Sequence, residues 1–288
     1  MNDAMRSMMR EYGPVKNPTD EINALREIVQ RVTLLGLHRG GFFAEASFYG
    51  GTALRLLYNL DRFSEDMDFC LNKPNARFTI APFFESITSE LERYGLEARV
   101  EEKNSGPEVS IESAFVKQNT CKGLLLIGSG SSKIPKEQLI KVRLEVDKLN
   151  PAGAKTCKKL VSLPTPFMVG TLTEESLFAG KLHALLARAY LNRVKGRDYY
   201  DFLFYCSRNA KVNLEYLEAK LRDSGHYSGQ EKLSISDLLE LLKRKFDTAD
   251  FEKVKADVRP FLKAEKARDL TEWSSELFSA LAEKIESE

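Results

Sequence analysis

The chain has 288 residues, of which 43 are Lys or Arg and 42 are Asp or Glu, so its formal net charge is +1. Apolar residues make up 43% and charged residues 30%, which is the composition of a globular protein. The length allows one large domain or two ordinary ones, and the near-zero charge excludes a protein that is basic throughout.

Membrane and disulfide-stabilised classes are also excluded at this stage. No stretch of about 18 apolar residues is present, so we expect no transmembrane helix. The polar N-terminal segment lacks the apolar core of a signal peptide. The cysteines lie far apart without a CxxC spacing, which argues against a zinc site or a disulfide framework and predicts a cytoplasmic protein; they are Cys70, Cys121, Cys157 and Cys206.

Helices and strands alternate in the first half of the chain. In chain order the patterns predict a helix over 19–36, a strand over 42–49, a helix over 52–58 after the Gly50-Gly51 break, a strand over 67–71, a helix over 80–94 and mostly strands over 96–148. The clearest of these strands is 140–147, where apolar and charged residues alternate with a period of two.

The second half reads as helical. Helices are predicted over 174–192, over 198–206 and in further stretches of 211–288. The proline-containing stretch 164–166 is the expected boundary. We therefore expect an α+β protein with a first domain over 1–165 and an α-helical domain over 166–288.

Two aspartates in the strand after the glycine pair are the first candidate site. Asp66 and Asp68 lie two residues apart, which on a strand puts both carboxylates on one face. Neighbouring carboxylates repel unless a cation lies between them, and Mg²⁺ is the usual choice beside phosphates. Gly50 and Gly51 precede a helix, where backbone N–H groups can approach a phosphate, and Thr52 adds a hydroxyl donor.

A third carboxylate is expected if a second ion is held for phosphoryl transfer. Glu145 and Asp147 are both candidates on the polar face of the 140–147 strand. We prefer Glu145 because it lies nearer the centre of that strand, and Asp147 stays the alternative.

Cations and acids also gather in the helical half. Lys181 and Arg188 are seven residues apart and point roughly the same way on a helix, an arrangement that suits a triphosphate. Asp198 begins the following helix, and Asp201 lies one turn later. Taken alone, these two aspartates are equally well explained as a helix cap and a surface charge.

Five stretches occurring in this order, GGTALRL, RFSEDMDF, IKVRLEV, ESLFAGKLHALLAR and RDYYDF, resemble the nucleotidyltransferase toxins of the AbiEii/AbiGii family. That family belongs to type IV toxin–antitoxin and phage-defence systems, and the resemblance covers about residues 45–206. It implies a DNA polymerase beta-like nucleotidyltransferase domain, a mixed sheet flanked by helices, followed by a helical domain. Gly180 departs from the family pattern, in which a larger residue is common before the lysine.

The resemblance also assigns roles to residues. It implies a phosphate-binding turn at Gly50 and Gly51 and a metal pair at Asp66 and Asp68, with Glu145 as the acidic residue of its strand. It implies catalytic or nucleotide-binding roles for Lys181, Arg197, Asp198 and Asp201, and we add Thr52, Arg55 and Arg188 to the nucleotide-binding candidates. The expected reaction uses two Mg²⁺ ions and moves a nucleoside monophosphate from an NTP onto an RNA, with the tRNA 3′ end as the preferred acceptor. The implied partners are the NTP, the RNA and a cognate antitoxin.

Charge is divided along the chain in a way that favours an RNA partner. Residues 117–160 contain ten Lys or Arg against three acids, a net +7, whereas 61–116 contain twelve acids against six bases, a net −6. A basic segment of this kind suits a nucleic-acid surface. Gly128–Lys133 lacks the spacing of a phosphate loop and is interpreted as a hairpin tip.

Two other functions stay open. One is a nucleotidyltransferase with a small-molecule or protein acceptor; the other is a non-catalytic module that binds nucleotide or RNA. Ser64 is a candidate regulatory position, because a phosphate there would add negative charge beside the aspartate pair, although a turn-forming serine explains it as well.

Overall fold

The computed structural model describes residues 3–103, 110–119, 138–188, 194–262 and 266–288. The chain divides into two compact units, each made of separate segments. The first, here called the sheet unit, comprises Met1–Tyr58, Glu65–Asn150 and Lys158–Thr171. The second, the helical unit, comprises Asn59–Ser64, Pro151–Cys157 and Leu172–Glu288.

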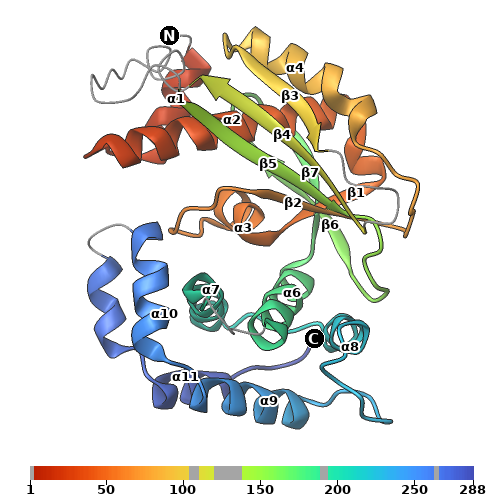
Figure 1. The fold of residues 1–288 in the computed structure, drawn as a ribbon, viewed down its shortest axis with the longest axis vertical. Coiled ribbons are helices and arrows are strands. Elements are labelled where there is room, and N and C mark those ends of the chain that lie inside the picture. Colours follow the sequence, from red (N-terminus) through yellow and green to blue (C-terminus); the bar gives the residue numbers. More distant parts are fainter. Residues whose placement is uncertain (1–2, 104–109, 120–137, 189–193, 263–265) are drawn as a thin grey trace. The chain divides into compact units, whose positions relative to one another are not determined.

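A seven-stranded mixed sheet with the order β3-β4-β5-β2-β1-β7-β6 organises the first half of the chain (Figure 1). β1 is antiparallel to β2 and parallel to β7, and β2 is parallel to β5. β4 is antiparallel to both β3 and β5. The strands are β1 (Ala46–Tyr49), β2 (Met67–Leu71), β3 (Ala98–Lys103), β4 (Ile111–Asn119), β5 (Leu139–Asp147), β6 (Thr156–Val161) and β7 (Phe167–Leu172).

Helices of the sheet unit cover one face of this sheet. They are α1 (Asp3–Tyr12), α2 (Pro18–Arg39), α3 (Gly50–Tyr58) and α4 (Phe84–Arg93), with short 3₁₀ turns η1 (Phe42–Ala44) and η2 (Ala81–Phe83). α2 begins where the Asn17 side chain caps the Asp20 N–H and Pro18 presets the first turn. α2 and α4 pack closely, since a Cβ on Gly36 would lie 2.6 Å from the Ile87 Cα (Figure 1).

The core of the sheet unit lies between these helices and the sheet. In β5, Val142, Leu144 and Val146 are fully buried, whereas Arg143 and Glu145 between them are partly exposed. One face of the strand therefore packs against the helices and the other carries polar groups, which is the arrangement that alternation predicts.

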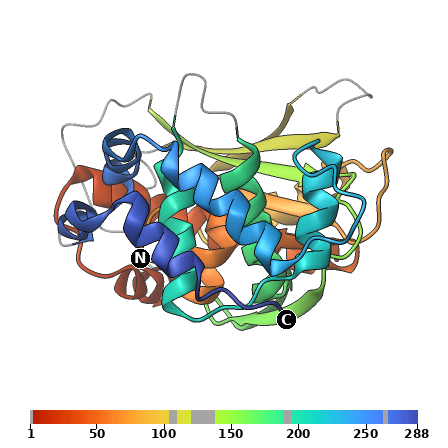
Figure 2. The ribbon, with the colours of Figure 1, turned by 90° about the horizontal axis from the view of Figure 1, so that it is seen from below.

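The helical unit has an aromatic core. Its elements are α6 (Glu174–Ala187), α7 (Gly196–Ser207), α8 (Leu214–Asp223), α9 (Ile235–Asp247), α10 (Phe251–Val258), η3 (Arg259–Phe261), η4 (Lys266–Glu272) and α11 (Ser275–Ala282). Phe202, Phe246 and Phe278 contact one another with ring centroids 5.2–5.7 Å apart. Figure 2 shows α9 and α11 side by side.

Most of the predicted elements are confirmed, with three differences. The predicted strand 42–49 is a 3₁₀ turn followed by the shorter β1, and the helix predicted over 174–192 ends at Ala187, with 189–193 outside the described residues. β7 pairs with β1, so residues 166–171 belong to the sheet unit rather than to the helical part expected from 166 onward. Gly128–Lys133 and Cys121 lie outside the described residues.

Helix α1 and strands β6 and β7 were not expected from the sequence. Among the described residues, no helix is both long and apolar enough to span a membrane.

Candidate functional site

Gly50 holds a position beside Asp68 that a residue with a side chain could occupy only under strain. Its φ is +79°, in the left-handed region that favours glycine, where the chain turns from β1 into α3. A Cβ at this position would lie 2.1 Å from the Asp68 Oδ2. The glycine turn and the carboxylate of Asp68 are therefore close together, and the phosphate-binding role of the turn stays a prediction.

The strand register brings Glu145 beside Asp68. The two residues are Cα partners in the parallel pairing of β2 and β5, so their side chains leave the sheet on the same face. Asp147 instead pairs with Cys70, and its Oδ1 accepts a hydrogen bond from the Leu149 N–H at 3.0 Å. Between the two carboxylates considered, Glu145 is the one beside the aspartate pair.

Arg143 is the cation of this acidic face. Its Nη1 donates to the Glu145 Oε1 at 3.0 Å, and its Nε lies 3.9 Å from the Asp66 Oδ1. The hydrogen bond to Glu145, together with the charges of Asp66 and Asp68, raises the pKa of Arg143. The Nε makes no hydrogen bond to any described residue. These three carboxylates and the Arg143 guanidinium together carry a net charge of −2.

Thr52 supports the aspartate pair through its hydroxyl. The side chain is fully buried, and the hydroxyl donates to the Asp66 backbone carbonyl. This contact ties the first turn of α3 to the start of β2, so the structure gives Thr52 a positioning contact; its predicted contact with phosphate stays untested. Gly51, also buried, lies in the same first turn of α3, where N–H groups lack intrahelical partners.

Arg55 faces the helices of the sheet unit. Its Nε donates to the Glu27 Oε2 at 2.6 Å, and its guanidinium lies 5.7 Å from the centroid of the Tyr12 ring. Glu27 also accepts from Arg31 at 3.1 Å. The structure therefore shows Arg55 in an ion pair with α2, and its nucleotide-binding role stays a prediction.

In the helical unit, Asp201 joins two cations. Arg62 donates to it twice, from Nε to Oδ1 and from Nη2 to Oδ2, both at 2.6 Å, and the Lys181 Nζ lies 2.6 Å from Oδ2. Burial would raise the pKa of Asp201, but the charges and hydrogen bonds of Arg62 and Lys181 outweigh it and hold the pKa below the ordinary value. The carboxylate thus stays ionised and fixes the lysine.

The remaining predicted residues of the helical unit make separate contacts. The Arg188 Nη1 lies 2.6 Å from the Asp198 Oδ2, and Asp198 is nearly fully buried while Arg188 is half exposed. Arg197 stacks on Phe261 at 4.3 Å from the ring centroid. Ser64 is partly buried at the end of the segment Asn59–Ser64.

Two residues of these clusters were not identified from the sequence as site residues. Arg143 was not singled out, although its place on the same face of the strand as Glu145 follows from the period of two. Arg62 gave no such signal, because its partner Asp201 is 139 residues away.

A row of basic residues crosses the open face of the sheet. Arg99 is the cross-strand partner of Lys117, and Lys117 is the partner of Lys141. Like charges at directly opposed positions are destabilising. The charge of Lys117 is offset by an ion pair with Glu101, whereas Arg99 and Lys141 are exposed to solvent. Lys141 shares its face of β5 with Arg143 and Glu145.

The acidic face fits a divalent metal by its donor chemistry. Asp68 and Glu145, paired across β2 and β5, and Asp66, immediately before β2, offer carboxylate oxygens with an excess of negative charge, which suits a hard cation. Among the described residues, however, no three His, Cys, Asp or Glu side chains already form a closed metal-binding group. Arg143, in contact with two of the carboxylates, supplies the compensating charge.

Comparison with known proteins agrees with this fold. The family model described as nucleotidyl transferase AbiEii toxin, type IV TA system, matches residues 33–282. JHP933 from Helicobacter pylori is similar in structure, with a TM-score of 0.50 and 18% identity over 88% of each chain. A candidate nucleotidyltransferase from H. pylori has a TM-score of 0.50 and 16% identity over 91% of this chain and 97% of its own. Among curated proteins, none matches this chain.

A mixed sheet with an aspartate pair beside a glycine turn is the arrangement of a nucleotidyltransferase, and the chain is an enzyme of this class. It belongs to the AbiEii family of nucleotidyltransferase toxins from type IV toxin–antitoxin systems, since the family match covers most of its length. This family generally uses an NTP and a divalent metal, and each of its toxins is paired with an antitoxin.

Proposed function

We propose that the protein is a toxin that transfers a nucleoside monophosphate from an NTP to an RNA, with the 3′ end of tRNA as the preferred acceptor, and so blocks translation and growth. The acceptor hydroxyl oxygen attacks the α-phosphorus, the bond to the β-phosphate breaks, and pyrophosphate leaves with the negative charge. The hydroxyl proton passes to a carboxylate or to water at the site.

We assign Asp66, Asp68 and Glu145 as the Mg²⁺ ligands and expect them to hold two ions. Bound Mg²⁺ would lower the barrier by neutralising charge on the phosphates and activating the acceptor hydroxyl. Gly50 and Gly51 open the first turn of α3, where free N–H groups and the helix dipole favour a phosphate. Thr52 holds the start of β2 in place through the Asp66 carbonyl.

The helical unit supplies the cations for the triphosphate in this proposal. Lys181 carries the charge, and Asp201 orients it; the lowered pKa of Asp201 makes that carboxylate a weak base. Arg188, held by Asp198, is a second phosphate ligand, and Arg197 is a further candidate. Ser64 stays a predicted regulatory position.

The basic row formed by Arg99, Lys117 and Lys141 is the observation that favours RNA as the acceptor. Repulsion between directly opposed cations is a cost to folding that a polyanion would relieve. The row lies on the same face of the sheet as Glu145, through β5. A small-molecule acceptor gives no reason for such a row. A cognate antitoxin and a cytoplasmic site of action complete the proposal.

The test is a transfer assay with purified protein, each of the four labelled NTPs, Mg²⁺ and total RNA. Asp68→Asn removes a proposed metal ligand, and Asp147→Asn is the matched control, since Asp147 lies on β5 beside Cys70 rather than beside Asp68. We expect label on a tRNA-sized band with the wild type and with Asp147→Asn, and loss of at least about 100-fold with Asp68→Asn.

Other outcomes distinguish the rival functions. Label found only on protein or on a small molecule would replace RNA as the acceptor. Absence of label with every acceptor, with intact binding of NTP or RNA, would favour a non-catalytic binding module.

A further inference from the structure

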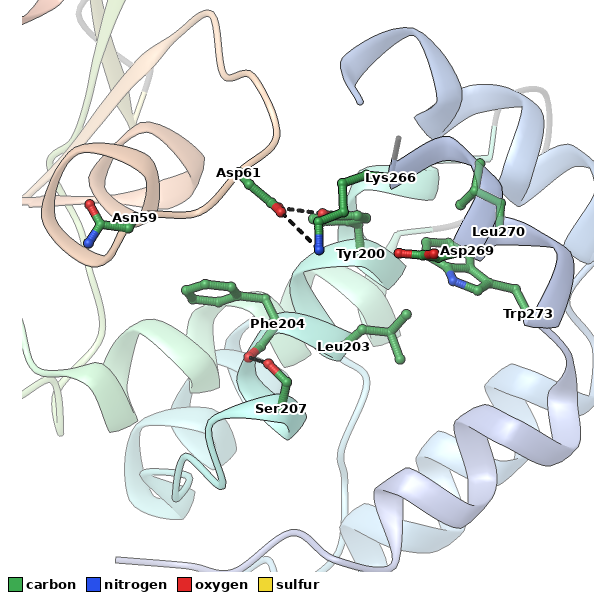
Figure 3. A pocket seen from close by; sticks show the side chains of 10 residues that line it. All are labelled: Asn59, Asp61, Tyr200, Leu203, Phe204, Ser207, Lys266, Asp269, Leu270 and Trp273. Atoms are coloured by element: carbon green, nitrogen blue, oxygen red, sulfur yellow. Dashed lines mark hydrogen bonds and ion pairs between the residues drawn. The ribbon is translucent and has the colours of Figure 1, made fainter. Parts of the chain in front are cut away.

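The helical unit contains a groove that the proposed reaction does not use. Its volume is about 340 Å³, and it lies between α7, η4 and the segment around Asp61 (Figure 3). That volume is at the lower end of the range for small-molecule sites, so it suits a compact ligand. Every residue that lines the groove belongs to the helical unit.

The walls of the groove are aromatic. Tyr200 and Phe204 lie one helical turn apart on α7 and are both partly exposed. Trp273 lies against Tyr200, with ring centroids 6.2 Å apart, and is itself only 4% exposed (Figure 3). The partly exposed rings of Tyr200 and Phe204 therefore form the accessible aromatic surface of the groove, which favours a flat, aromatic ligand.

The polar groups at the groove include two carboxylates, Asp61 and Asp269. The Tyr200 hydroxyl donates to the Asp61 Oδ1, and the Lys266 Nζ lies 3.6 Å from the Asp61 Oδ2. Burial and Asp61 both raise the pKa of Tyr200, so this hydroxyl stays a donor to Asp61. Asp269 also lines the groove, and the structure shows it in no hydrogen bond or ion pair with the described part of the chain.

We propose that this groove binds a nucleobase that carries an amino group, with its ring stacked on the exposed faces of Tyr200 and Phe204 and its amino group donating to Asp269. A carboxylate accepts hydrogen bonds but donates none, so it selects a ligand edge with N–H groups. The groove has two aspartates against one lysine, a net charge of −1, and therefore disfavours phosphate.

This proposal rests on the proposed function and adds a base-binding site to it. A nucleotidyltransferase that modifies RNA handles two bases, one on the NTP and one at the RNA end. Both sources offer the same chemistry to the groove, and the experiment separates them.

Intrinsic fluorescence gives a direct readout, because Trp273 is the single tryptophan of the chain and lines the groove. Metal-free protein is titrated with two pairs of nucleosides, cytidine against uridine and guanosine against inosine. Guanosine and inosine differ only by the amino group of guanosine. Cytidine has an amino group where uridine has a carbonyl oxygen, and its neighbouring ring nitrogen carries no hydrogen. N-acetyltryptophanamide corrects for absorption by the nucleosides.

We expect saturable quenching, with cytidine and guanosine binding about tenfold more tightly than uridine and inosine, as a hydrogen bond to a charged group predicts. Asp269→Asn should abolish this preference. Glu272→Gln, which removes the same charge from η4 at a residue outside the groove, should keep it. Phe204→Ala should weaken the binding of all four nucleosides to a similar extent.

Two further ligands assign the source of the base. Tighter binding of a short single-stranded RNA ending in C than of metal-free CTP assigns the groove to the acceptor, and the reverse order assigns it to the donor. The proposal is overturned if no nucleoside changes the Trp273 emission, or if Asp269→Asn binds all four as the wild type does. Because no metal or turnover is involved, this failure would leave the transfer assay with Asp68→Asn unaffected.

Discussion

Gly50 shows at the scale of one residue how the fold and the proposed chemistry depend on each other. An alanine there would have to adopt a φ of +79° and would place its Cβ 2.1 Å from the Asp68 Oδ2. The backbone conformation alone costs about 1–2 kcal/mol for a residue with a side chain. Gly50→Ala is therefore expected to lower the melting temperature by several degrees and the transfer rate by about 100-fold, because it displaces Asp68.

Thermal unfolding and single-turnover transfer measure these two effects. Gly180→Ala is the control, since a Cβ on that helical glycine would meet nothing within 4 Å. It should leave stability unchanged or raise it by about 1 kcal/mol. A Gly50→Ala enzyme with the wild-type transfer rate would contradict the role given to the turn.

Arg143 competes with the metal if our assignment of the acidic face is right. It pairs with Glu145 and lies 3.9 Å from the Asp66 Oδ1, so a cation that binds there must do so beside its charge. Arg143→Met should tighten Mn²⁺ binding, measured by electron paramagnetic resonance, by about tenfold, the effect of one nearby charge. Lys141→Met removes the same charge two residues away and should change the affinity much less. Unchanged or weaker binding in Arg143→Met would contradict the assignment.

At the scale of elements, Asp201 connects α7 to α6 and to the segment before β2. The carboxylate is fully buried and Arg62 is 2% exposed, so Asp201→Asn leaves two cations without their counter-charge. We expect a loss of about 3–5 kcal/mol in the free energy of unfolding, measured by urea titration. Asp198→Asn should cost only about 1 kcal/mol, because its partner Arg188 is half exposed. Equal losses in the two variants would contradict this difference.

The same carboxylate makes stability depend on pH. Its pKa is lower in the folded than in the unfolded protein, so its contribution is complete above the ordinary aspartate pKa of about 4. The contribution is lost as the pH falls through the folded value. Urea titrations below about pH 4 should therefore show a steeper loss of stability in the wild type than in Asp201→Asn. Parallel profiles would mean that Asp201 is not the titrating group.

Local patterns predicted the elements that carry the aspartate pair. The alternation in 140–147 and the i, i+2 spacing of Asp66 and Asp68 follow from the period of a strand, and β5 and β2 confirm both strands. α1 was missed although Met5, Met8 and Tyr12 follow a helical spacing and are buried. The choice of Glu145 beside Asp68 needed the register between two strands, and the pairing of Arg62 with Asp201 needed the tertiary fold.

For the whole molecule, a net charge near zero is the sum of separate basic and acidic regions, and the strand pairing shows where these regions lie. Arg99, Lys117 and Lys141 form a basic row across three strands, while the carboxylates gather farther along β2 and β5. If the row contacts RNA phosphates, Lys141→Gln should weaken RNA binding equally for all sequences. It should also reduce the slope of log affinity against log salt by about 0.7, the value for one contact to a single strand.

Filter binding between about 50 and 200 mM salt measures this slope. Lys243→Gln, an exposed lysine of α9 with the same change in charge, is the control and should leave the slope unchanged. Equal slopes for Lys141→Gln and the wild type would remove the basic row from the RNA-binding surface.

The central claim is transfer of a nucleoside monophosphate to an RNA 3′ hydroxyl, and the most direct measurement compares intact tRNA with tRNA whose 3′ diol has been oxidised by periodate. With labelled NTP and Mg²⁺, the account predicts label on intact tRNA, one pyrophosphate released for each nucleotide added, and no label on oxidised tRNA. Equal labelling of the two tRNAs, or label that stays on the protein while tRNA remains unmodified, would contradict it.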